Sequence, residues 1–182
     1  MNYIIQFLTY FRIFIAPIIF LLIISNLYGW ALFFTLIASM SDFWDGHLAR
    51  KYNLESVLGS ILDPIADKIL LTFLILSLSL SMSSTYIGFI GGLILIREFW
   101  VAALRDINAR ANNEAATTVT TLAKIKTFTQ LTAFLVIILG LYSNNTLVIF
   151  IGNFCLFISL IVTLQSGLEY TLNTFSHLKS RR

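Results

Sequence analysis

Six long apolar runs are the feature that most constrains the fold of this 182-residue chain. A helix needs roughly 20 predominantly apolar residues to cross the hydrocarbon core of a bilayer. Because lipid offers no hydrogen-bond partners to the backbone, we expect each run to be helical. We therefore predict an all-α membrane protein with six transmembrane helices, at residues 13–28, 30–47, 61–82, 86–104, 128–142 and 147–164.

The composition agrees with a membrane protein. Hydrophobic residues make up 58% of the chain and charged residues 12%, whereas soluble domains average about 45–50% and about 25%. The short links at 26–29, 81–85 and 143–145 contain the turn formers Asn, Gly and Ser. Residues 2–12 are interpreted either as an interfacial amphipathic helix or as the first turns of the first span. No internal repeat or linker is visible, so we expect one domain over residues 1–182.

The basic residues are confined to one side of this topology. All twelve Lys and Arg precede the first run, lie near the join of the second and third, occupy the second half of the fourth run and the link after it, or follow the sixth. The other three links contain none, so the positive-inside rule places both termini in the cytoplasm. The nine acidic residues follow the same partition. The net charge of +3 therefore reflects membrane topology and does not indicate nucleic-acid binding.

Four aspartates stand where the second and third runs approach the cytoplasm. An ionised carboxylate at membrane depth is costly, so such residues are functional candidates. The four are Asp42, Asp45, Asp63 and Asp67. The alternative is that they form structural ion pairs with the nearby cations Arg50, Lys51 and Lys68.

On each of these two runs, acidic and small residues share one helical face. The face on the second run spans an arc of roughly 140° and contains Asp42, Asp45, Gly46, Ala49 and Arg50. The face on the third run contains Gly59, Asp63 and Asp67, which are spaced at i, i+4 and i+8. A short link makes the two runs antiparallel neighbours, so both faces can line one cavity.

The chemistry of this acidic set favours Mg²⁺ or Mn²⁺. Carboxylate oxygens suit these ions, whereas zinc prefers His or Cys, and the only histidines are His47 and His177. Two divalent ions held by carboxylates promote displacement at phosphorus by binding the attacking and leaving oxygens. The planar guanidinium of Arg50 can donate two parallel hydrogen bonds, like the prongs of a fork, to phosphate oxygens. The residues thus predict a metal-dependent reaction at a phosphate, at the cytoplasmic membrane surface.

The order of these residues also forms a known pattern. Asp42-Phe-Trp-Asp45-Gly46-His-Leu-Ala49-Arg50, followed by Gly59, Asp63 and Asp67, resembles the signature of the CDP-alcohol phosphotransferase family, with all eight fixed positions filled. The resemblance implies that the four aspartates bind two divalent metal ions and that Asp67 is also the general base. It further implies contacts to CDP-diacylglycerol from Gly46, Ala49, Arg50, Ser56 and Gly59.

The second half of the chain resembles the branch of that family whose acceptor is sn-glycerol 3-phosphate. The similar segments are residues 96–105, residues 123–127 with Gln130, and residues 163–170. The resemblance implies that CDP-diacylglycerol and sn-glycerol 3-phosphate give phosphatidylglycerol phosphate and CMP. It also implies a homodimer among membrane lipids, in the bacterial cytoplasmic membrane with the active site facing the cytoplasm.

A phosphorylated acceptor requires cations, and the chain offers several on the cytoplasmic side. The candidates are Arg12, Arg97, Arg105, Lys124 and Lys126. Alternatively, Arg97 forms a structural pair with Glu98, and the two lysines serve only the membrane topology.

Two other functions are alternatives to this one. One is a different acceptor in the same family, namely inositol phosphate, serine or phosphatidylglycerol. The other is a small cation or proton transporter that uses the aspartates. Transporters often contain paired repeats or helices interrupted by Gly and Pro, and neither pattern is visible in this sequence.

Overall fold

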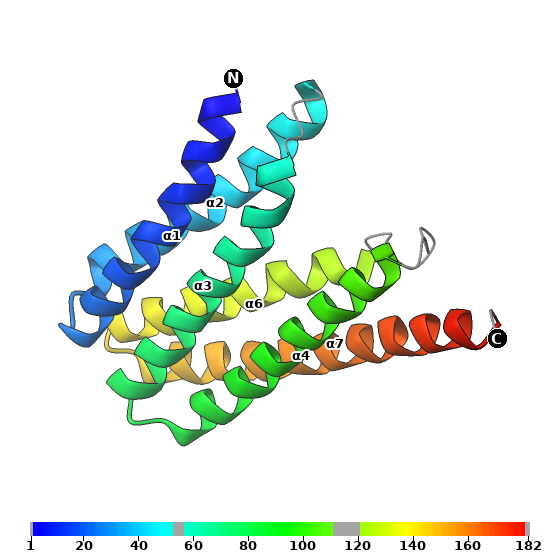
Figure 1. Cartoon of the computed structure of the whole chain (residues 1–182). Coiled ribbons are helices and arrows are strands. Elements are labelled where there is room, and N and C mark those ends of the chain that lie inside the picture. The colour runs from blue at the N-terminus through cyan, green and yellow to red at the C-terminus, as the bar shows by residue number, and fades with distance from the viewer. Residues whose placement is uncertain (1, 53–56, 111–120, 181–182) are drawn as a thin grey trace.

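The computed structural model describes residues 2–52, 57–110 and 121–180, and within them the side chains of residues 9–41, 62–110 and 126–176. The regular structure in these ranges is helical, as predicted (Figure 1). The helices are α1 (Asn2–Ile24), α2 (Tyr28–Tyr52), α3 (Val57–Ser81), α4 (Thr85–Arg110), α6 (Thr121–Tyr142) and α7 (Thr146–Ser180). Because α1 is continuous from Asn2, the segment before the first apolar run forms the first turns of that helix and no separate interfacial helix.

Three tight turns join the helices at one end of the bundle. Each turn contains one residue with left-handed backbone geometry: Asn26 (φ 59°), Ser83 (φ 47°) and Asn144 (φ 49°). Asn adopts this conformation more readily than most residues. The Asn145 side chain then accepts hydrogen bonds from the first backbone amides of α7, including that of Leu147 at 3.0 Å, which caps the helix. The turn signals in the sequence therefore mark these helix ends correctly.

The turns fix how the ends of the chain are arranged. Figure 1 shows the three turns at one end of the bundle, and the amino end of α1 and the carboxyl end of α7 at the other. The two ends thus lie on one side, as the charge pattern predicts. That this side is cytoplasmic remains a prediction.

Adjacent helices pack closely where small residues meet neighbouring backbone. α1 packs against α2 and α3, α3 against α4, α4 against α7, α7 against α6, and α6 against α2. In the α6–α7 hairpin, a Cβ atom on Gly152 would lie 2.6 Å from Cγ1 and 2.9 Å from the backbone nitrogen of Ile137. Gly140 meets Ile149 in the same way. Glycine thus allows these backbones to approach, as is common where helices associate in lipid.

The surface of the bundle is apolar and part of its interior is polar. The outward-facing side chains of Phe14, Phe89, Phe128 and Phe150 are between 70% and 73% exposed. Buried hydroxyls such as Thr35 bond to a carbonyl of their own helix, here that of Ala31 at 2.7 Å. Large exposed aromatics would be unfavourable in water, whereas hydrocarbon solvates them well.

Three segments are long and apolar enough to cross a membrane, among the residues described: Leu62–Ser81, Thr85–Arg110 and Thr146–Ser176. Three more are apolar but shorter over their described parts: Thr9–Ile24, Tyr28–Ser41 and Lys126–Tyr142. The chain is an all-α membrane protein. The number of six crossings stays a prediction.

Candidate active site

Two of the four predicted aspartates lie on α3 and contact one arginine of α1. Asp63 and Asp67 are four residues apart, so they share a face of α3. Arg12 donates from Nη1 to Oδ1 of Asp67 at 2.5 Å, and from Nη2 to Oδ1 of Asp63 at 3.4 Å. Thr9 Oγ1 also donates to Oδ1 of Asp63, at 2.6 Å. Packing of α1 against α3 therefore sets the positions of both carboxylates.

Burial differs sharply within this group. The Arg12 side chain is 0% exposed, whereas those of Asp63 and Asp67 are 36% and 45% exposed. The guanidinium is thus held on the protein side of the carboxylates, and the carboxylates lie between it and the surroundings. Two acids and one arginine carry a net charge of −1, which suits a cation better than an anion.

The remaining residues of the predicted acidic site fall outside the described side chains. Asp42, Asp45, Gly46, Ala49 and Arg50 belong to the last part of α2, and Gly59 to the first turn of α3. Ser56 lies between the two helices, outside the described residues. Among the described side chains, no group of three or more His, Cys, Asp or Glu could hold a metal ion. Whether the two acidic faces meet in one cavity therefore stays a prediction.

A second polar cluster joins α4 to α6. Glu98 Oε1 accepts a hydrogen bond from Arg97 Nη1 at 3.1 Å and another from Lys126 Nζ. Arg97 and Lys126 are buried, and the Glu98 side chain is 16% exposed. One carboxylate thus pairs with two cations, which leaves a net positive charge inside the bundle. The predicted pairing of Arg97 with Glu98 is observed, and a contact of Arg97 with the acceptor phosphate stays a prediction. Lys126 is buried and bonds to Glu98, so it is not merely a surface charge.

Polar side chains of α7 extend this cluster toward the carboxyl end. Arg97 Nη2 donates to Ser166 Oγ at 2.6 Å, and Arg105 Nη2 donates to the Tyr170 hydroxyl at 3.2 Å. The Arg105 guanidinium also lies 5.2 Å from the centre of the Tyr170 ring, within range of a cation–π interaction. A Cβ on Gly167 would lie 3.0 Å from the Arg97 side chain, so glycine leaves space for that arginine.

Arg97 and Arg105 can each donate a further hydrogen bond. The Nε atoms of Arg97 and Arg105 are buried and have no hydrogen-bond partner among the described residues. Arg105 is partly exposed, whereas Arg97 is not. With Lys126 and a single acid, Glu98, these groups carry a net charge of +2. This arrangement favours an anionic ligand at the α4–α6–α7 junction.

The structure thus sorts the five predicted cations into different places. Arg12 lies with the aspartates, whereas Arg97, Arg105 and Lys126 lie together. The side chain of Lys124 falls outside the described ones. Sequence reasoning assigned no site role to the α1 and α7 side chains that contact these cations, namely Thr9, Ser166 and Tyr170. For Thr9, its spacing of three residues from Arg12 on one helix was an available signal.

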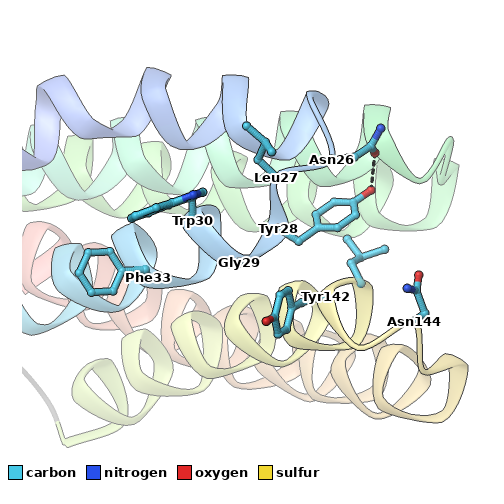
Figure 2. A pocket seen from close by; sticks show the side chains of 9 residues that line it. Asn26, Leu27, Tyr28, Gly29, Trp30, Phe33, Tyr142 and Asn144 are labelled. Carbon is cyan, nitrogen blue, oxygen red and sulfur yellow. Dashed lines mark hydrogen bonds between the residues drawn. The ribbon is translucent and has the colours of Figure 1, made fainter.

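A hollow of about 690 Å³ lies at the opposite end of the bundle, beside the tight turns. Figure 2 shows Tyr28 and Trp30 on one side of it and Tyr142 on the other. The Tyr28 hydroxyl donates to Asn26 Oδ1 at 2.6 Å, and the lining is otherwise mainly apolar and aromatic. It contains no acidic or basic side chain, so it cannot supply the chemistry predicted for the aspartates.

Comparison with known proteins identifies the family. The sequence model of CDP-alcohol phosphatidyltransferases matches residues 3–165. The chain belongs to this family. The CDP-alcohol phosphatidyltransferase match includes Asp63, Asp67 and Lys126, and ends one residue before Ser166, although α7 continues to Ser180.

Several relatives carry one and the same name, CDP-diacylglycerol–glycerol-3-phosphate 3-phosphatidyltransferase. The relative from Rickettsia bellii is 38% identical, with 91% of each chain covered. That from Blochmanniella floridana is 32% identical, with 95% of this chain and 91% of the relative covered. That from Shigella flexneri is 29% identical, with 90% of each covered.

Proposed function

We propose that this membrane enzyme transfers the phosphatidyl group of CDP-diacylglycerol to sn-glycerol 3-phosphate, giving phosphatidylglycerol phosphate and CMP. The observation that carries the proposal is the likeness, over nine-tenths of the chain, to relatives named for this reaction. Membership of the CDP-alcohol phosphatidyltransferase family makes the chain a transferase of substituted phosphate groups. The net positive charge around Arg97, Arg105 and Lys126 supports an acceptor that carries a phosphate.

We assign the divalent ions, Mg²⁺ or Mn²⁺ and two in number, to Asp42, Asp45, Asp63 and Asp67. The described part of this set fits such ions, because Asp63 and Asp67 offer hard oxygen ligands, keep more than a third of their side-chain surface exposed, and share a net negative charge with Arg12. When bound, the ions would neutralise the negative charge that develops on the phosphate oxygens.

The side chains of the chain itself have three tasks in the transfer. Asp67 accepts the proton of the acceptor hydroxyl, so that its oxygen attacks the β-phosphorus of the donor while the bond from that phosphorus to CMP breaks. Arg12 and Thr9 hold the two α3 carboxylates at fixed points. Gly46, Ala49, Arg50, Ser56 and Gly59 are the proposed contacts of CDP-diacylglycerol.

We assign the acceptor phosphate to the cluster on α4 and α6. Arg105 is more accessible than Arg97 and Lys126, so a ligand would meet it before these two. Arg97 and Lys126 lie deeper, and Lys124 precedes Lys126 by two residues on α6. Arg12 is not assigned to this phosphate, because its buried guanidinium donates to the aspartates.

The charge pattern and the bacterial relatives support a proposal for the cellular setting. We propose a single domain, residues 1–182, that crosses the bacterial cytoplasmic membrane six times with both termini and the active site in the cytoplasm. We further propose that it works as a homodimer surrounded by membrane lipids.

A reconstituted assay tests the reaction. Purified protein, CDP-diacylglycerol and labelled sn-glycerol 3-phosphate should yield CMP and a labelled lipid only with Mg²⁺ or Mn²⁺ present. Asp67→Asn should lower kcat by a factor of at least about 10³, because both the base and a metal ligand are lost. The matched control is Asp106→Asn, which removes an exposed carboxylate paired with Arg110. Equal activity of the two variants would refute the role of Asp67.

A second assay tests the acceptor. Arg105→Ala and Lys126→Ala should each raise the KM for sn-glycerol 3-phosphate by about tenfold or more, since a charge-assisted hydrogen bond contributes about 1.5–3 kcal/mol. Arg110→Ala, which removes an exposed arginine of the same helix, is the control. Faster turnover with inositol phosphate, serine or phosphatidylglycerol would place the enzyme elsewhere in the family.

A further inference from the structure

We infer that Thr9 and Arg12 are a positioning pair: they fix Asp63 and Asp67, and Arg12 supplies the counter-charge that sets how tightly these carboxylates bind a divalent cation. This inference rests on the proposed function, because it concerns the aspartates assigned there to metal ions.

The geometric part follows from the spacing of the pair. Thr9 and Arg12 are three residues apart, so both point from one face of α1 toward α3. Asp63 Oδ1 accepts from both side chains, and Asp67 Oδ1 accepts from Arg12. The two nitrogens of one planar guanidinium thus hold two carboxylates at a set separation. A lysine has a single nitrogen and cannot reproduce this arrangement.

The electrostatic part follows from burial. Arg12 is fully buried, so its charge is screened by water far less than a surface charge would be. A divalent cation at Asp63 and Asp67 is attracted by two negative charges and repelled by one positive charge. The pair therefore keeps metal affinity moderate. Oxygens of the donor's pyrophosphate would strengthen the binding of such an ion.

The experiment measures metal binding without substrates. Purified protein is titrated with Mn²⁺ at a fixed pH of 8, and the free ion is measured by its paramagnetic resonance signal. Arg12→Gln should bind Mn²⁺ about tenfold more tightly than the unmodified chain, because a nearby positive charge is gone. Its kcat should nevertheless fall by about 10²-fold, the cost of misplaced catalytic groups. Arg110→Gln, which removes an exposed charge of the same type, should leave both values unchanged.

Two further variants separate position from charge. Thr9→Val removes one donor at nearly constant volume and charge, so kcat should fall about fivefold, the value of one hydrogen bond, while Mn²⁺ affinity holds. Arg12→Lys keeps the charge but not the fork, so Mn²⁺ affinity should stay within about threefold while kcat falls at least about tenfold. If Arg12→Gln does not fold, Arg12→Lys still decides whether Arg12 positions the carboxylates.

The outcomes are distinguishable. Absence of Mn²⁺ binding by the unmodified protein would overturn the proposed metal site itself. Unchanged or weaker Mn²⁺ binding by folded Arg12→Gln would overturn the counter-charge role alone. Full kcat in Arg12→Lys and Thr9→Val would overturn the positioning role.

Discussion

Glu98 allows the sharpest prediction about stability, because one carboxylate serves two buried cations. Its Oε1 atom accepts hydrogen bonds from Arg97 of the same helix and from Lys126, and the contact with Lys126 connects α4 to α6. Glu98→Gln keeps the size and the oxygen of the side chain but removes its charge. The variant therefore leaves Arg97 and Lys126 without a counter-charge inside the bundle.

The expected loss follows from burial. Removing one member of a buried ion pair typically costs about 3–5 kcal/mol, since the other charge remains desolvated. The glutamine oxygen can still accept one hydrogen bond, and Glu98 is 16% exposed, which favours the lower end, about 3 kcal/mol. For a chain of this size such a loss corresponds to a fall in Tm of roughly 6–12 °C.

Thermal unfolding of the purified protein in detergent, followed by tryptophan fluorescence, measures this loss. Asp106→Asn breaks an exposed ion pair with Arg110 on the same helix, so its cost should be below about 1 kcal/mol. The comparison keeps the helix and the type of charge change constant while burial differs. If Glu98→Gln and Asp106→Asn melt at the same temperature, the buried network does not stabilise the bundle by the expected amount.

Three further predictions concern other sites. Gly152→Ala should destabilise by about 1–3 kcal/mol because its Cβ would press on the Ile137 backbone, whereas Gly92→Ala, with nothing within 4 Å, should be neutral or stabilising in the same melting assay. Tyr170→Phe removes the hydroxyl but keeps the ring beneath Arg105, so the KM for sn-glycerol 3-phosphate should rise no more than about fivefold. Tyr170→Leu loses both the ring and the hydroxyl, so its KM should rise further. Chelation of divalent ions should abolish CMP release and readdition of Mg²⁺ should restore it; release that persists in chelator would contradict a metal-dependent transfer.

The sequence predicts the helices well but not where each one ends. The apolar runs and the turn residues Asn26 and Asn144 correctly locate the helices and tight turns. The last run, however, predicts an end near residue 164, whereas α7 continues to Ser180. Hydropathy marks where a helix would leave hydrocarbon. Hydropathy does not detect the contacts beyond that point, where Ser166 and Tyr170 accept hydrogen bonds from α4.

The site is only partly predictable for a related reason. Spacing alone places Asp63 and Asp67 on one face of α3, as observed. The partner of Arg12 depends on how α1 rotates against α3, and a single sequence does not specify that rotation. The same holds for Arg97: its contacts with Glu98 and Ser166 depend on how α4 packs against its neighbours, which a single sequence does not specify.

The side-chain hydrogen bonds between α4 and α7 also have a mechanical consequence. Three of them follow one another in register along two parallel helices: Arg97 with Ser166, Arg105 with Tyr170, and Asn108 with Thr174. Sliding one helix past the other by a single turn would break all three at once. Along this length the two helices therefore move as one rigid unit. A conformational change that admits a lipid substrate must occur in other parts of the bundle.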